Sequence, residues 1–177
     1  MLPGAGVTVW LALPALLLAA EDLDSSTCLT LDPFDSALPQ TTPSPYTLSC
    51  SKTGKITNQD SVIFTIKSSR PRVDFRRFVV QALDRESGVA VGMFVDTGDA
   101  DITVVNCFGR SENTAIEFDT EPKTEARMRW MPDFDYAGNI TFFATIVQSG
   151  EIFWLIRSLY TTLGRNLHII SDVCRFS

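Results

Sequence analysis

Five cationic side chains lie within eleven residues of one segment. They are Lys67, Arg70, Arg72, Arg76 and Arg77. Pro71 places the first half of this segment in a loop. Clustered arginines bind sulfate and phosphate groups through paired hydrogen bonds. The segment predicts a contact with an anionic glycan or a microbial surface glycolipid, and the alternative is a solvated loop without a ligand.

The four cysteines predict two disulfides. They are Cys28, Cys50, Cys107 and Cys174. An even number of cysteines in a secreted chain is typical of internal pairing, and three pairings are open. The alternative is that Cys174 links two chains. No two cysteines are close enough in sequence for a zinc knuckle, so we expect no metal.

Two further segments contain residues that could be modified or could bind a metal ion. Asn139-Ile140-Thr141 is the only N-x-[ST] sequon and predicts an N-linked glycan at Asn139. The segment 96–101 gathers three aspartates around a glycine. It lacks the order of an EF-hand loop, so it predicts a turn rather than a calcium site.

The sequence predicts no enzyme and no cofactor. It contains no G-x-S-x-G elbow, no H-E-x-x-H pair and no phosphate-binding glycine loop. His168 is the only histidine, and the thiols that would partner it are expected to be oxidised.

The N-terminal segment 1–20 resembles a secretory signal peptide. Its apolar run from Val7 to Ala20 is too short to span a bilayer, and small residues precede Glu21. The alternative is an uncleaved or buried N-terminal helix. No second apolar run reaches transmembrane length, so we expect a secreted, extracellular chain with no transmembrane segment after cleavage. The net charge of −6 argues against nucleic acid as a partner.

Apolar residues alternate with polar ones from Tyr46 onward, which predicts strands. In the segment 61–67, Val62, Phe64 and Ile66 share one face. In 124–130, Ala126 and Trp130 alternate with charged residues. Further strands are predicted at 75–83, 89–95, 101–106 and 113–118.

The last two predicted strands form a hairpin. The segment 139–148 is apolar on both faces and suits a central strand covered on both sides, and 152–157 follows a short Ser149-Gly150 link. Trp130, Phe153 and Trp154 are expected in the core. About eight to nine strands and no capped helix predict an all-β antiparallel sandwich, with a barrel as the second choice.

Three clusters of residues resemble the reeler domain, the module at the N-terminus of reelin and of the spondins. The first combines 78–82 with 91–94. The second combines Cys107 with Pro122-Lys123 and 130–132. The third is Gly138 followed by 142–148 and Phe153-Trp154. Order and spacing agree from about Cys28 to Ser158.

The resemblance implies an immunoglobulin-like sandwich, an extracellular setting and a non-enzymatic role. It implies that Cys28 pairs with Cys107, which leaves Cys50 with Cys174. Two positions depart from the family pattern, where Arg77 replaces a glycine and Glu117 replaces a histidine.

The chain is expected to divide into a signal peptide (1–20), an irregular segment (21–45), the sandwich (46–158, with 28–45 packed on it) and a C-terminal extension (159–177). The predicted function is recognition or adhesion through a protein or anionic glycan partner. One alternative is a defence protein that binds microbial surfaces, and another is a truncated form of a larger reeler-containing membrane protein.

Overall fold

The computed structural model describes residues 28, 37–52, 57–95, 102–117, 120–136 and 138–157. Within this part of the chain, nine strands and no long helix carry the fold. They are β1 (Tyr46–Cys50), β2 (Val62–Ser68), β3 (Arg77–Asp84), β4 (Met93–Val95), β5 (Thr103–Cys107), β6 (Arg110–Glu117), β7 (Glu125–Met131), β8 (Ile140–Ser149) and β9 (Ile152–Arg157). Residues 37–45 are irregular, as expected for this proline-rich segment.

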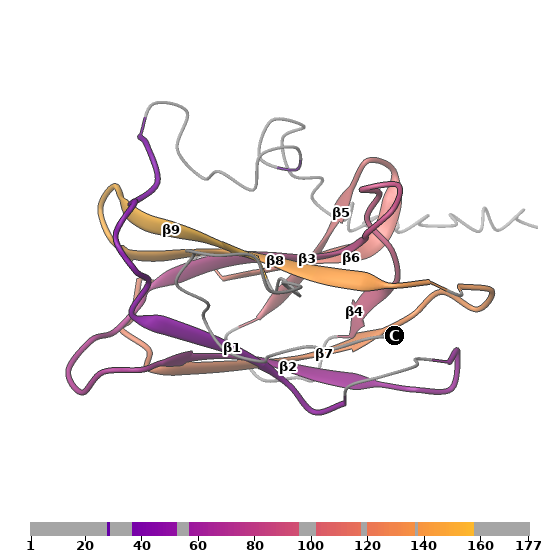
Figure 1. Ribbon diagram of the computed structural model, residues 1–177, viewed down its shortest axis with the longest axis horizontal. Coiled ribbons are helices and arrows are strands. Elements are labelled where there is room, and N and C mark those ends of the chain that lie inside the picture. The colour runs from indigo at the N-terminus through magenta and orange to yellow at the C-terminus, as the bar shows by residue number, and fades with distance from the viewer. Residues whose placement is uncertain are drawn as a thin grey trace, which may run out of the picture.

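The strands form two antiparallel sheets that pack face to face, as Figure 1 shows. The four-stranded sheet has the order β1-β2-β7-β4, and the five-stranded sheet has the order β5-β6-β3-β8-β9. The predicted all-β sandwich is therefore confirmed. None of the described residues belongs to a helix that is long and apolar enough to cross a membrane.

An aromatic cluster joins the two sheets. Phe142 of β8 stacks on Phe64 of β2 with ring centroids 4.6 Å apart, and it meets Trp130 of β7 edge-on at 5.6 Å. All three rings are fully buried. Trp130 also donates its indole N–H to the backbone oxygen of Val91. The expected core positions of Trp130, Phe153 and Trp154 are confirmed by their burial.

The five-stranded sheet carries buried apolar residues on both faces. On its inner face, Phe78 and Val80 join the main core. On its outer face, Val79, Val105 and Ile116 form a second apolar cluster. This agrees with the expectation that the strand now seen as β8 is covered on both sides, because it lies between β3 and β9 and is buried along most of its length.

The segment predicted as one strand at 89–95 instead crosses from one sheet to the other. Ala90 forms an isolated antiparallel bridge with Leu83 of β3, whereas β4 pairs with β7 in the opposite sheet. Gly92 lies between them with φ of +68°. An L side chain rarely adopts this conformation, so the glycine allows the chain to turn from one sheet to the other.

Candidate functional site

The five cations of the segment 67–77 lie on two sides of the sandwich. Lys67 points outward from the four-stranded sheet, because its neighbours Ile66 and Phe64 face the core. Arg77 lies on the opposite sheet, one residue before Phe78, and alternation directs it to the outer face shared with Val79. The run is therefore not one continuous patch.

The remaining members of the run lie in the β2–β3 loop. Arg70 and Arg72 are exposed, and Arg72 has a φ of +65°. Arg76 is half-buried and donates from a guanidinium nitrogen to the backbone oxygen of Thr120 at 2.6 Å. The Arg76 guanidinium group therefore stabilises the loop that precedes β7, which leaves fewer of its donors for a ligand. Lys67, Arg70 and Arg72 are the exposed members of the run.

Two arginines outside this run lie on the same outer face as Lys67. Arg127 and Arg129 project from the outer face of β7, where Arg127 pairs with Thr65 and Arg129 with Ile63. We call the surface formed by Lys67, Arg127 and Arg129 the cationic face. The alternation of the segment 124–130 already placed both arginines outward, but only the β2–β7 register shows which residues lie next to them.

One carboxylate is embedded in the cationic face. Glu125 Oε2 accepts from Lys67 Nζ at 3.1 Å, and Oε1 accepts from Arg127 Nε at 2.5 Å. These hydrogen bonds, that from Lys67 first, lower the pKa of Glu125. Glu125 thus stays ionised and fixes the two cationic side chains in position. The three cations and one anion leave a net positive charge on the face.

Hydroxyl groups extend the cationic face toward β1. Ser49 pairs with Thr65, which pairs with Arg127, so these three residues form one row across the sheet. In the next row, Thr47 pairs with Lys67. Hydroxyl donors beside guanidinium groups suit sulfate and carboxylate oxygens, which accept several hydrogen bonds at once.

The disulfide between Cys28 and Cys107 joins the N-terminal segment to β5. The sulfur atoms are 2.04 Å apart, and both residues are buried. This is the pairing that the family resemblance implied. Cys50 is also disulfide-bonded, and its predicted partner Cys174 lies outside the described residues.

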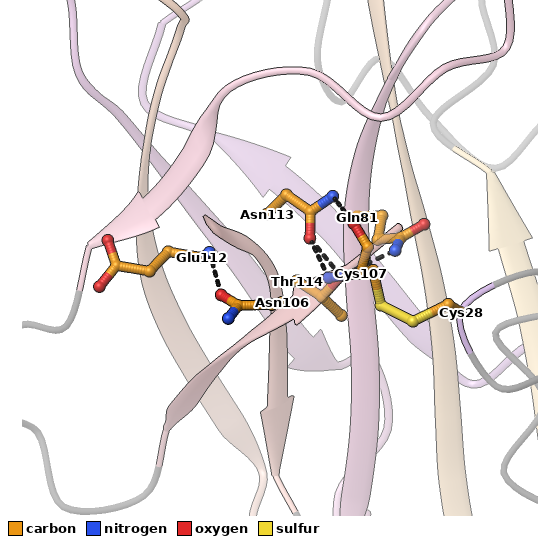
Figure 2. The surroundings of a disulfide bond; sticks show 7 residues. All are labelled: Cys28, Gln81, Asn106, Cys107, Glu112, Asn113 and Thr114. Carbon is orange, nitrogen blue, oxygen red and sulfur yellow. Dashed lines mark hydrogen bonds between the residues drawn. A yellow bond between two sulfur atoms is a disulfide. The ribbon is translucent and has the colours of Figure 1, made fainter. Parts of the chain in front are cut away.

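Figure 2 shows the polar side chains around this disulfide. Asn113 of β6 is buried and accepts from the Cys107 N–H at 2.8 Å, while its Nδ2 donates to the Cys107 carbonyl at 3.0 Å. The strand register shifts between Val105 and Cys107. Cys107 itself pairs with Arg110 at the end of the hairpin, and the Asn113 amide adds side-chain bonds to both of its backbone polar groups beside the irregularity.

Asn139, the predicted glycosylation site, is half-buried immediately before β8. Its backbone oxygen accepts from Arg85 N–H at 2.9 Å, so this contact does not involve the side-chain amide to which a glycan would be attached. Glycosylation at Asn139 stays a prediction. The acidic segment 96–101, His168 and the signal peptide lie outside the described residues. In the part that is described, no three His, Cys, Asp or Glu side chains gather as a metal site.

Comparison with known proteins identifies the class of protein that this fold represents. The family model of the reeler domain matches residues 26–165. The chain therefore belongs to the reeler domain family.

The curated relatives divide into two kinds. The chain is 31% identical to "Putative defense protein" of Bombyx mori, over 73% of this chain and 76% of that protein. It is 28% identical to "Putative ferric-chelate reductase 1" of Danio rerio, over 75% of this chain but only 23% of that protein. The match to the second kind of relative is thus limited to one part of a longer protein.

Among solved structures, the human F-spondin reeler domain matches with a TM-score of 0.56 at 16% identity. The match covers 70% of this chain and 94% of that one. At this level of identity the match supports the fold alone, and it agrees with the two-sheet sandwich described above.

Proposed function

We propose that this chain is a secreted, non-enzymatic recognition module whose partner is an anionic glycan. The observation that carries the proposal is the cationic face, where Lys67, Arg127 and Arg129 project from adjacent paired strands. Because these side chains stand on a rigid sheet rather than on a loop, little conformational entropy of the backbone is lost when a ligand binds.

The electrostatics of the cationic face favour a polyanion over a single ion. The charge is spread along β7 rather than gathered around one point, and Arg70 and Arg72 continue it from the end of β2 at which Lys67 stands. A linear chain with repeated sulfate or carboxylate groups would contact several of these cations at once. The contacts would weaken as salt screens them.

Secretion is part of the same proposal. Disulfides persist mainly in oxidising compartments, and the Cys28–Cys107 disulfide is buried inside the fold. The signal-peptide pattern of residues 1–20 and the reeler membership support this setting. A non-enzymatic role agrees with the absence of catalytic motifs from the sequence.

Affinity chromatography on immobilised heparin tests the proposal. The double variant R127A/R129A is expected to elute at a clearly lower salt concentration than the parent, and R70A/R72A to shift in the same direction by less. Arg85→Ala is the matched control, since Arg85 is an exposed arginine on the turn after β3. Equal retention of the parent and R127A/R129A would contradict the proposal.

A defence role is the second candidate function, and the relatives named defense proteins favour it. These relatives match over most of their own length, 76% in Bombyx mori and 77% in Antheraea mylitta. The corresponding ligand is a microbial surface glycolipid, whose phosphate groups would contact the same cationic face. Sedimentation with lipopolysaccharide, compared with heparin retention on the same variants, separates the two candidates. A truncated form of a larger membrane protein is a further alternative, and the partial matches to the longer reductases favour it.

A further inference from the structure

A pocket lies beside the Cys28–Cys107 disulfide, between the β3–β4 connection and the β5–β6 turn. Its volume is about 340 Å³, which falls within the range of about 300–1,000 Å³ typical of small-molecule sites. Leu83, Val89, Ala90 and Phe108 give it mainly apolar walls.

Phe108 is held over this pocket in a strained backbone conformation. It occupies the two-residue turn between β5 and β6 with φ of +56°, and Gly109 follows with φ of +70°. Such turns usually carry Asn, Asp or Gly at these positions. The Phe108 side chain is 55% exposed, so burial in the core does not offset the strain. Strain of this kind is concentrated at sites of function.

Gln81 supplies a polar side chain to the same pocket. Thr114 donates its hydroxyl hydrogen to Asn113 Oδ1 at 3.3 Å, so the Thr114 oxygen accepts from Gln81 Nε2 at 2.7 Å. This chain of hydrogen bonds fixes the orientation of the Gln81 amide. Gln81 as a whole is only 2% exposed and lines the pocket, and because Nε2 is used by Thr114, Oε1 is the amide atom that it can offer to a ligand.

The positive charge that Arg110 brings to the pocket is paired with the carboxylate of Asp133. Arg110 is the one charged residue among the described lining residues. It donates to the backbone oxygen of Ala90 and, at 3.2 Å, to the carboxylate of Asp133. An anionic ligand would therefore compete with Asp133, whereas a neutral ligand leaves this arrangement intact.

We infer that this pocket binds a small, neutral, mainly apolar molecule with one hydrogen-bond donor, of the phenol or indole class. The ring packs against Phe108 and Leu83, and the hydroxyl or N–H donates to Gln81 Oε1. This inference goes beyond the proposed function, since the pocket lies at the disulfide and the cationic face lies on the other sheet.

Titrations of the ¹⁵N-labelled oxidised protein with three probes test the inference. p-Cresol is expected to cause saturable shifts at the amides of Gln81, Ala90 and Phe108, with a dissociation constant on the order of 1 mM for so small a ligand. Toluene, which lacks the donor, should bind about tenfold more weakly because it forms no hydrogen bond with the Gln81 carbonyl oxygen. 4-Methylbenzoate should cause no saturable shift.

Three variants keep the test specific to the pocket. Val89→Trp fills it and should abolish the p-cresol shifts, while Leu38→Trp adds the same ring at a position that is 85% exposed and should leave them unchanged. Gln81→Leu should bind p-cresol and toluene equally. Equal binding of the two probes by the parent, or unchanged p-cresol binding by folded Val89→Trp, would overturn the inference.

Discussion

Asn113 stabilises the fold by bonding the backbone polar groups of Cys107 with its side-chain amide. Its amide satisfies both the N–H and the C=O of Cys107, and its Oδ1 also accepts from Thr114. All three residues are buried, so water is not an alternative partner. A buried backbone group without a hydrogen bond costs about 1–3 kcal/mol. The side chain of Asn113 therefore matters for stability rather than for contact with a ligand.

Replacing Asn113 by alanine is expected to lower the free energy of unfolding by about 3 kcal/mol, because two backbone groups of Cys107 lose their partners. Urea unfolding of the oxidised protein measures this change. Asn106→Ala is the control from the same hairpin. Asn106 is half-buried and accepts a single hydrogen bond, from Glu112 N–H, so its loss should cost less than about 1 kcal/mol. Similar losses in the two variants would contradict this account.

The ionisation of Asp84 is expected to make the stability of the fold depend on pH in acid. The Ser87 N–H, the Tyr136 hydroxyl and the Ser87 hydroxyl donate to its carboxylate and lower its pKa from 3.8 to about 2. Since the pKa is lower in the folded chain, the stabilisation is complete above about pH 4 and is lost as the pH falls toward 2.

The melting temperature of Asp84→Asn should therefore depend less on pH between 4 and 2 than that of the parent. Because Asp84 is only half-buried and solvent screens its interactions in part, we expect a modest difference. Tyr136→Phe removes one of the donors and should give an intermediate slope. A parent and an Asp84→Asn variant with parallel profiles would show that Asp84 does not carry this dependence.

At the scale of the elements, Gly92 determines where the chain changes sheets. A Cβ at this position would lie 2.3 Å from the backbone oxygen of Met131 and 2.4 Å from the Trp130 ring. The close approach lets β4 pair with β7, while Asp133 accepts from the Gly92 N–H at 2.9 Å. The segment 89–95 therefore contributes to both sheets rather than forming one strand.

Gly92→Ala is expected to destabilise the fold by more than about 3 kcal/mol, because the added methyl group meets backbone and a buried ring as well as an unfavourable φ. Gly88→Ala is the matched control. It has nearly the same φ, +69°, but nothing lies within 4 Å of its added Cβ, so it should cost about 1 kcal/mol. Thermal unfolding of both variants distinguishes the steric effect from the conformational one, and equal losses would refute it.

The elements also show what the sequence could and could not predict. Alternation identified β2, β7 and β9 nearly to the residue, because each has one buried face or lies at the edge of a hairpin. It did not predict the sheet crossing at Gly92, which depends on contacts with β7. It also treated the cations of 67–77 as one patch. Their separation, and the position of Arg127 beside Lys67, depend on the register between distant strands.

At the scale of the whole molecule, the Cys28–Cys107 disulfide constrains the chain that precedes the sandwich. The two residues are 79 positions apart, and in the chain-entropy model a loop of this length is worth about 4–5 kcal/mol. The double variant C28S/C107S should lose about 3–5 kcal/mol in guanidinium unfolding while keeping a β-rich circular dichroism spectrum. A loss below about 1 kcal/mol would show that the sandwich does not depend on this disulfide.

The whole molecule thus has two sheets with different roles. The five-stranded sheet carries buried apolar residues on both faces as well as the Cys28–Cys107 disulfide, while the four-stranded sheet presents its outer face to solvent. Recognition of a large polyanion requires an open surface, which the four-stranded sheet offers. This division is the physical basis of the proposed function.

NMR mapping of a bound heparin oligosaccharide shows whether the cationic face is the binding surface. We expect the amides of Thr65, Lys67, Arg127 and Arg129 to shift together and the shifts to diminish with added salt. Shifts centred on Arg77 and Val79 of the five-stranded sheet, or no saturable shifts at low salt, would contradict this expectation.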